Sequence, residues 1–211
     1  MPGAPANAEG RVAPPRRLLL ATANRGKVRE IAALLGPDWE LVPQSDYGIP
    51  AVAETGATFA ENALLKARHA AAASGLPALA DDSGLEVDAL GGAPGVRSAR
   101  YAGAHASDAD NCARLLSELQ GVPDERRTAR FRCVLALARG AEDAAPLLAE
   151  GVWEGRIVRT ARGFNGFGYD PVFGDPASGQ TAAELSPAAK NQRSHRAMAL
   201  RRLAGMLDNI W

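Results

Sequence analysis

The chain is poor in cysteine, histidine and aromatic residues, and it has no excess of either charge. Its two cysteines, Cys112 and Cys133, form no Cys-x-x-Cys pair, so a thiolate metal site is not expected. Two cysteines in a chain this long are typical of small apolar residues in a reducing cytosol, and we expect a cytoplasmic protein. The 24 basic and 24 acidic side chains argue against a surface dedicated to nucleic-acid backbones.

No run of eighteen apolar residues occurs, and the N-terminus is not a charged stretch followed by an apolar one. We therefore expect neither a membrane span nor a secretory signal. Residues 1–16 contain four prolines and almost no large apolar side chain, which predicts a disordered tail. Residues 17–211 show no internal repeat and no linker, and their length suits a single domain.

Apolar runs and alternating patterns predict strands, and apolar residues at i, i+3, i+4 and i+7 predict helices. We expect strands over 17–23, 39–43, 76–80, 85–89 and 129–138, and one or two more within 147–158. We expect helices over 28–35 (stopped by Gly36-Pro37), from Thr58 to about Ser74, from Ser107 or Asp108 through Leu119, after Ser186-Pro187, and at the C-terminus. Because the two kinds of element are interleaved, the sequence predicts an α/β fold.

Two adjacent carboxylates follow the short apolar strand expected over 76–80. Ligands bind near strand ends in open α/β sheets. Because neighbouring side chains of a strand point to opposite faces, Asp81 and Asp82 cannot share one role, and only one easily faces a cleft. Ser83-Gly84 predicts a turn whose backbone can approach a ligand closely. Taken alone, this segment is more often a strand end closed by turn-forming residues.

The segment from Thr22 to Lys27 joins the first expected strand to the first expected helix. The unpaired N–H groups and the partial positive charge of a first helical turn attract phosphate. Lys27 adds a full charge, and Gly26 lets the backbone close on an anion. The segment is not a Walker A loop, and a lysine on a solvated helix face is an equally good interpretation of these six residues alone.

Glu54 and Asp82 both occupy expected loop or strand-end positions. Such an arrangement suits a magnesium ion held by one or two carboxylates and by phosphate oxygens. An exposed loop acid is the alternative interpretation of Glu54.

A second group of residues is suited to a planar ligand. Phe167 to Asp170 would place aromatic rings beside it, although a loop anchored by core aromatics has the same pattern. Lys190, His195 and Arg196 offer three donors near the entrance of a helix. A merely solvated basic turn there would oppose the helix dipole. A phosphate site, metal carboxylates, rings and polar donors together predict a nucleoside triphosphate site.

Several segments resemble, in order, the inosine triphosphate pyrophosphatase family. They are TANRGK at 22–27, ETGATFAENALLKA at 54–67, ADDSGLEVDALGGAPGVRSARYAG at 80–103, FGYDPVF at 167–173, TAAEL at 181–185 and SHRAMAL at 194–200. The resemblance extends over nearly everything from residue 18 to residue 207. Bacterial members of the family cleave deaminated purine nucleoside triphosphates, which removes them before they enter DNA and RNA.

The resemblance implies a role for particular residues. Asp82 matches the general base and magnesium ligand, and Glu54 aligns with an acidic metal-site region. The implied substrate-binding residues are Thr22, Ala23, Asn24, Arg25, Gly26, Lys27, Lys66, Ser83, Phe167, Gly168, Tyr169, Asp170, Lys190, His195 and Arg196. Two residues beside the site depart from the family pattern. Arg97 stands where family members often have an aromatic residue, and Ala189 stands where they have an acid before the lysine.

The resemblance also implies an elongated mixed β-sheet with flanking helices, two lobes around a central cleft, and a homodimer. The implied reaction is attack on the α-phosphorus by a water that Asp82 activates, with release of pyrophosphate. Arg196 and a protonated His195 would donate to the 6-keto group of inosine or xanthosine and face the 6-amino group of adenosine donor to donor.

Two other functions remain open at this point. One is a related pyrophosphatase that acts on pyrimidine nucleotides or is of the septum-inhibitor type. The other is a nucleotide-binding regulator without catalytic activity, although the presence of Asp82 argues against it.

Overall fold

The computed structural model describes residues 16–35 and 38–207 of the chain. At its centre is a six-stranded sheet with the order β2-β1-β3-β4-β5-β6. The strands are β1 (Arg16–Leu20), β2 (Trp39–Pro43), β3 (Ala78–Val87), β4 (Thr128–Ala138), β5 (Leu147–Ile157) and β6 (Phe173–Gly174). β1 pairs in parallel with β2 and β3, and the pairs from β3 to β6 are antiparallel. The sheet is therefore mixed, as expected.

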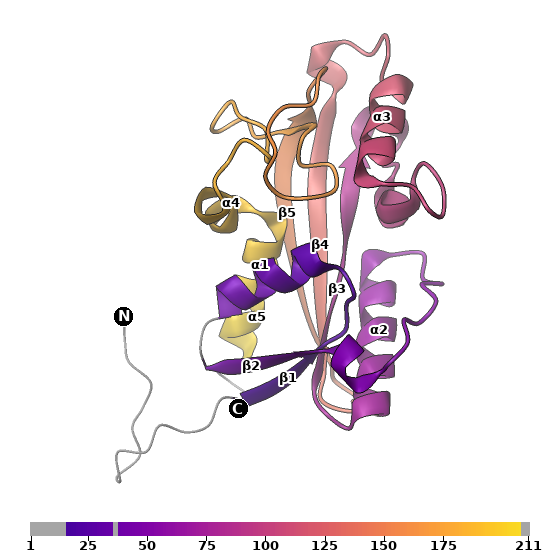
Figure 1. Cartoon of the computed structure of the whole chain (residues 1–211), viewed down its shortest axis with the longest axis vertical. Coiled ribbons are helices and arrows are strands. Elements are labelled where there is room, and N and C mark those ends of the chain that lie inside the picture. Colours follow the sequence, from indigo (N-terminus) through magenta and orange to yellow (C-terminus); the bar gives the residue numbers. More distant parts are fainter. Residues whose placement is uncertain (1–15, 36–37, 208–211) are drawn as a thin grey trace.

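Helices are interleaved with the strands along the chain and flank the sheet. They are α1 (Arg25–Leu35), α2 (Phe59–Ser74), α3 (Asp108–Glu118), α4 (Pro187–Arg193) and α5 (His195–Leu207), with 3-10 turns at 44–47, 88–90, 95–100 and 124–126. Figure 1 shows an elongated molecule in which β3, β4 and β5 run through both lobes. α1, α2 and α5 flank one half of these strands, and α3 flanks the other. The expected two-lobed α/β fold is confirmed.

Several expected boundaries change in the structure. Of the expected tail, residues 1–15 lie outside the described part of the chain, and Arg16 is already the first residue of β1. The expected helix stop at Gly36-Pro37 also lies outside it. The region 147–158 holds one strand, β5. No helix in the described part of the chain is long and apolar enough to cross a membrane.

Local side-chain caps account for three helix starts. Thr58 and Glu61 form the expected capping box at the start of α2, in which each side chain bonds the other residue's backbone N–H. Ser107 caps α3, and Ser186 caps α4. Because α4 ends before the extended residue Ser194, the chain re-enters a separate helix, α5, at the next residue.

The strand end and turn expected around Asp82 are wrong. β3 continues without a break and pairs residue by residue with β4 from Ala78 to Val87. The two carboxylates are accommodated inside a strand because cationic side chains neutralise both of them. Gly84 is needed for a close approach, since a Cβ there would lie 2.5 Å from the carbonyl oxygen of Gly95. The expected strands 76–80 and 85–89 are thus one strand.

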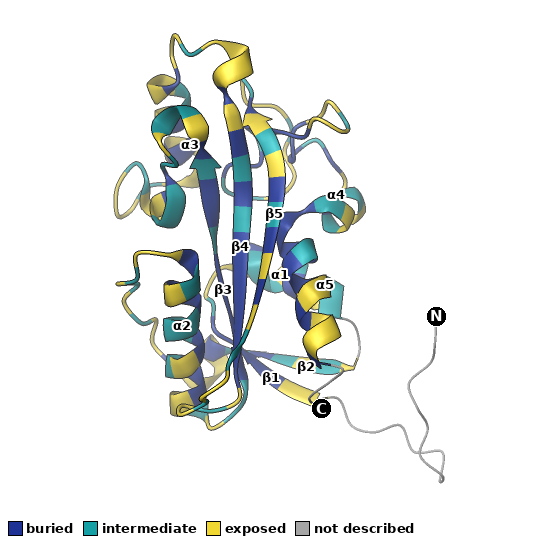
Figure 2. Cartoon of the chain, turned by 180° about the vertical axis from the view of Figure 1, so that it is seen from behind, coloured by how far each residue is buried: buried dark blue, intermediate teal, exposed yellow. Residues whose placement is uncertain are grey.

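Around Ala80 and Ala136, residues of β3 and β4 alternate between two cores, and the far halves of both strands contribute to a third. One core packs Ala80 and Ala136 against α2, and the other packs Leu79 and Leu137 against α1 and α5. Figure 2 shows the buried residues along the strands and on the sides of α2 and α5 that face them. Because Asp81 and Asp82 follow this alternation, each carboxylate enters a different layer of the fold.

Candidate active site

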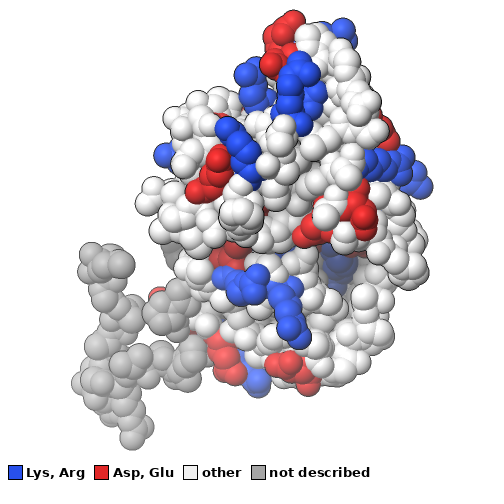
Figure 3. All heavy atoms as spheres, turned by 45° about the horizontal axis from the view of Figure 1, so that its top comes forward, with Lys and Arg blue, Asp and Glu red and all other residues white. Residues whose placement is uncertain are grey.

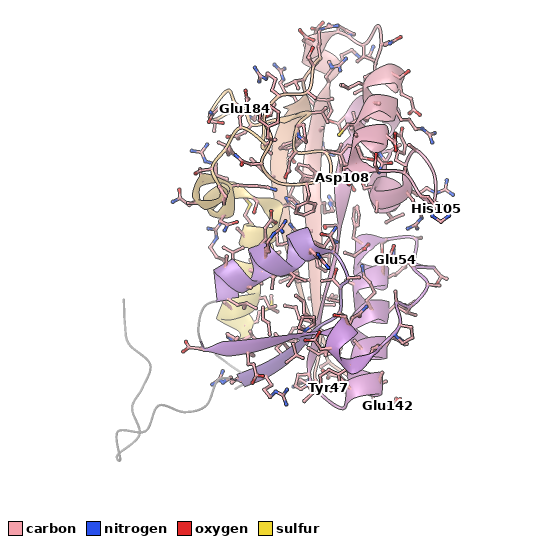
Figure 4. All side chains as sticks on the ribbon, in the orientation of Figure 1. Tyr47, Glu54, His105, Asp108, Glu142 and Glu184 are labelled. Carbon is pink, nitrogen blue, oxygen red and sulfur yellow. The ribbon has the colours of Figure 1, made fainter. Side chains whose placement is uncertain are left out.

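A cavity of about 310 Å³ lies between the two lobes and is lined by residues from most of the segments singled out in the sequence, 181–185 excepted. The expected site residues that line it are Thr22, Ala23, Asn24, Lys27, Glu54, Lys66, Ser83, Phe167, Gly168, Tyr169, Asp170, Lys190, His195 and Arg196. Figure 4 labels Glu54 on the α2 side and Asp108 on the α3 side of this opening. In the space-filling view, basic side chains are visible inside the hollow between the lobes (Figure 3).

The turn at Thr22–Lys27 is organised by Asn24. The Asn24 side-chain oxygen accepts hydrogen bonds from the backbone N–H groups of Gly26 (2.8 Å) and Lys27 (3.1 Å). Two N–H groups of the first turn of α1 are therefore already hydrogen-bonded and do not bind a ligand. An anion at this turn would be attracted by the ammonium of Lys27 and by the helix dipole. Arg25 is exposed and does not line the cavity. Gly26 is buried, and a Cβ there would lie 2.5 Å from the Phe167 ring.

Asp81 and Asp82 have separate partners, as their alternation predicts. The Asp81 carboxylate contacts Lys27 Nζ at 2.6 Å and Arg196 Nε at 2.7 Å. Burial raises the pKa of Asp81, but the charges of Arg196 and Lys27 outweigh this effect and hold the pKa well below its usual value. Asp81 was not expected to belong to the site, and only its position beside Asp82 in a strand pointed to it.

Asp82 contacts Lys66 Nζ at 2.7 Å and the side-chain amide of Asn62 at 3.4 Å. Burial raises the pKa of Asp82, and the charge of Lys66 only partly offsets this increase. A raised pKa suits a carboxylate that accepts a proton near neutral pH. Asp82 is buried and does not line the cavity. Its ion-pair partner Lys66 lines the cavity.

The carboxylates of Glu54 and Asp82 both form ion pairs with the ammonium group of Lys66. Lys66 Nζ lies 3.1 Å from a Glu54 oxygen and 2.7 Å from an Asp82 oxygen. No group of three or more histidine, cysteine, aspartate or glutamate side chains suited to a metal occurs among the described residues. A metal at this position would therefore take at most these two carboxylates from the protein and its other ligands from phosphate and water. That donor set fits Mg²⁺.

The Phe167 ring packs on Gly26 and lies close to two cations of the cavity. Lys190 Nζ lies 5.0 Å and Arg196 Cζ 5.6 Å from the ring centroid. Glu30 in α1 binds Lys190 at 2.9 Å and also pairs with Arg196. Sequence reasoning missed Glu30, for which the only signal was its place one helical turn after Lys27.

The 167–170 loop divides into a ligand-facing part and an anchor. The Tyr169 side chain is buried, and its hydroxyl donates to the carbonyl oxygen of Ser98 at 2.8 Å. Asp170 accepts a hydrogen bond from the Phe167 N–H at 2.9 Å and pairs with Lys190. The alternative interpretation, a loop anchored in the core, therefore holds for these two residues, and the half-buried Phe167 lines the cavity.

The surroundings of His195 favour its neutral form, so they do not support the protonated donor, which the sequence had left open. Burial lowers the pKa of His195 well below its usual value, and the charges of Arg196 and Lys190 lower it further. The ring stacks on Phe131 with centroids 4.8 Å apart, and its Nδ1 has no hydrogen-bond partner. A neutral imidazole offers one donor and one acceptor, so Arg196 is the permanent donor at this end.

The two departures from the family pattern lie outside the cavity. Arg97 is exposed, Ala189 packs against the hydrophobic cluster around Phe131 and Trp153, and neither lines the cavity. Each directly precedes a residue that lines the cavity, Ser98 and Lys190 respectively, so both stand beside the site as expected without forming its surface. Neither residue therefore weakens the assignment of the site.

The buried neutral His195 makes stability depend on pH. The unfolded chain binds a proton on His195 near pH 6.5, whereas the folded chain does not, so stability is lost as the pH falls below that value. We expect the free energy of unfolding to fall by about 1 kcal/mol between pH 6.5 and 5.5 from this group. Urea unfolding at several pH values measures it.

His195→Gln should flatten this dependence. The matched control is His105→Gln, since His105 is exposed and lies outside the cavity. An unchanged pH dependence in His195→Gln would contradict the assignment of the neutral state.

Comparison with known proteins identifies the family of this chain. The model of the Ham1 family matches residues 18–206. The chain belongs to the Ham1 family. It is similar to a dITP/XTP pyrophosphatase of Methylococcus capsulatus, with 61% identity over 91% of this chain and 96% of that protein. It is also similar to a dITP/XTP pyrophosphatase of Vibrio cholerae, with 56% identity over 89% and 94% of the two chains.

Solved structures of Ham1 proteins have the same fold. A HAM1 protein from Coxiella burnetii superposes with a TM-score of 0.85 and is 49% identical over 92% of this chain and 99% of that chain. The Staphylococcus aureus Ham1 protein gives a TM-score of 0.82 at 40% identity, over 92% and 99%. The expected relationship to the inosine triphosphate pyrophosphatases is thus confirmed at the level of the family and of the fold.

Proposed function

We propose that this Ham1 protein hydrolyses the deaminated purine nucleoside triphosphates ITP, dITP and XTP to the monophosphate and pyrophosphate. The observation that carries the proposal is a cavity lined by the cations Lys27, Lys66, Lys190 and Arg196 together with the aromatic ring of Phe167. A nucleoside triphosphate has an anionic phosphate chain, which the cations would bind, and a planar base, which the ring would stack on. The two dITP/XTP pyrophosphatases named above, each more than half identical to this chain, support it.

Asp82 is the group best suited to activate water. Its raised pKa makes it a better proton acceptor than a solvated carboxylate, and Lys66 holds it in place. Lys27 and Lys66 line the same cavity and neutralise phosphate charge, which favours attack on a polyanion. Ser83 and Thr22 add hydroxyl groups along the path between them.

Mg²⁺ is the proposed cofactor, held by Asp82 and Glu54. When bound, it would neutralise phosphate charge and orient the phosphate chain. The support is the arrangement of two carboxylates about one ammonium nitrogen. Lys66 would then exchange part of its contact with these acids for contact with phosphate.

Recognition of the base is assigned to Arg196 and Phe167. The Arg196 guanidinium has only hydrogen-bond donors, so it can bond the 6-keto oxygen of inosine or xanthosine. The 6-amino group of adenosine is also a donor and would leave both groups unpaired. Phe167 offers a ring for stacking. Neutral His195 adds the unpaired Nδ1, whose donor or acceptor state follows the ring tautomer.

A homodimer and a cytoplasmic location are further proposals. The family resemblance supports the first. The two free cysteines, both buried among the described residues, support a reducing compartment. Sedimentation analysis of the purified chain measures the oligomeric state.

The deciding experiment is pyrophosphate release from ITP, XTP, GTP, ATP and dTTP with Mg²⁺ and with EDTA. We expect ITP and XTP to exceed GTP and ATP by at least tenfold in kcat/KM, and EDTA to abolish turnover. Preference for dTTP would support a pyrimidine-directed enzyme instead. Binding of every nucleotide without release of pyrophosphate would support a non-catalytic regulator.

A further inference from the structure

One buried residue outside the cavity contacts three of the cations that line it. Asp81 does not line the cavity, and its side chain is fully buried. Nevertheless, atoms of Asp81 contact Lys27, Lys66 and Arg196, which all line the cavity. These three side chains come from α1, α2 and α5, respectively. In the described part of the chain, Asp81 therefore links cavity cations that come from three different helices.

At the phosphate end, Asp81 binds two lysines with different groups. Its carboxylate contacts Lys27 Nζ at 2.6 Å, and its backbone carbonyl oxygen accepts from Lys66 Nζ at 2.8 Å. Lysine side chains are flexible, and each lysine nitrogen has only three N–H donors. The contacts with Asp81 consequently restrict where the remaining donors of both lysines point.

At the base end, the guanidinium of Arg196 is held on three nitrogens. Nε donates to Asp81 at 2.7 Å, Nη2 donates to Ser83 Oγ at 3.0 Å, and Nη1 donates to Glu30. The Ser83 hydroxyl donates in turn to Asp81 at 2.8 Å, which closes a ring of three residues. Because a guanidinium is planar with five N–H groups, these bonds fix its plane and leave two N–H groups for a ligand.

We propose that Asp81 is a positioning residue that fixes the phosphate-binding Lys27 and the base-binding Arg196 relative to each other for binding of one nucleotide. This inference rests on the proposed function, because it assigns the two cations to the two ends of the same substrate. A buried ion pair that serves stability alone would have no such effect on ligands. The two roles differ in what happens to binding by protein that remains folded.

The test uses two half-ligands and the variant Asp81→Asn. Inorganic tripolyphosphate is the probe for the phosphate end, and inosine is the probe for the base end. Asparagine keeps the size of the side chain but replaces one acceptor oxygen by an NH₂ group that faces donors. We expect the dissociation constants of both probes, measured by NMR titration of folded protein, to rise at least fivefold. A smaller rise for either probe overturns the proposal.

Two further variants keep the test decisive. Asp175→Asn is the matched control, because Asp175 is a buried acid that binds Arg193 and Trp153 and does not line the cavity. This control should leave both dissociation constants within twofold of the wild type. A fivefold rise would show that the loss of any buried acid weakens binding, and that result would overturn the proposal.

If Asp81→Asn does not fold, Ser83→Ala replaces it. This variant opens the ring at Arg196 and leaves the pair between Asp81 and Lys27 in place. Inosine binding should weaken at least threefold and tripolyphosphate binding less than threefold, and any other result overturns the proposal. Wild-type turnover of ITP is measured separately, so a failure of the proposed function is distinguishable from a failure of this inference.

Discussion

Replacing Asp82 with asparagine is expected to lower kcat for ITP by about 10²–10⁴-fold while ITP still binds. The substitution removes the proton acceptor and keeps the shape of the side chain. The loss of one negative charge beside Lys66 also frees that ammonium to hold phosphate more tightly. Binding should therefore survive, and the effect should fall on kcat.

The measurement is pyrophosphate release at saturating ITP, together with the dissociation constant of ITP by calorimetry. Asp88→Asn is the control, because Asp88 follows the same strand but lies outside the cavity, where it binds Arg130 and Thr128. It should leave kcat within twofold. A near-normal kcat in Asp82→Asn would remove this residue from the chemistry.

Gly151→Ala is expected to have the largest effect on stability. A Cβ at Gly151 in β5 would lie 2.0 Å from the carbonyl oxygen of His195 and 2.6 Å from the backbone nitrogen of Ala199. Both atoms belong to the backbone of α5, which cannot move aside as a flexible side chain can. α5 must therefore shift away from the sheet, and it carries His195 and Arg196 with it.

We expect Gly151→Ala to destabilise the protein by about 3 kcal/mol, measured as the free energy of unfolding in urea. The KM for ITP should rise as well, since the base-binding end is displaced. Gly140→Ala is the control, because Gly140 has open space around its Cβ position and should change stability by less than about 0.5 kcal/mol. Equal stability of Gly151→Ala and the wild type would contradict the close packing of α5 on β5.

Local patterns of the sequence predicted the elements whose causes are local. The capping box of Thr58 and Glu61, the proline that opens α4, and the periodic apolar faces of the helices depend on residues a few positions apart. The resemblance to a known family supplied most of the cavity-lining residues. These parts of the fold and of the site could therefore be predicted without coordinates.

Sequence-based expectations failed where contacts between residues far apart in the chain determine the local structure. Asp82 was expected at a strand end because two carboxylates inside a strand are unfavourable unless cations from other elements neutralise them. Those cations, Lys27, Lys66 and Arg196, are far from β3 in the sequence. The protonation of His195 likewise depends on burial, which no local pattern reports.

The three long strands β3, β4 and β5 limit how this enzyme can respond to a nucleotide. They pass from one lobe into the other, and β3 and β4 pair without interruption past the two carboxylates. Any closure of the lobes around a nucleotide must therefore bend or twist this continuous sheet, which resists such a change more than a flexible linker does. We expect Lys66 to give up part of its contact with Glu54 and Asp82 when phosphate enters the cavity.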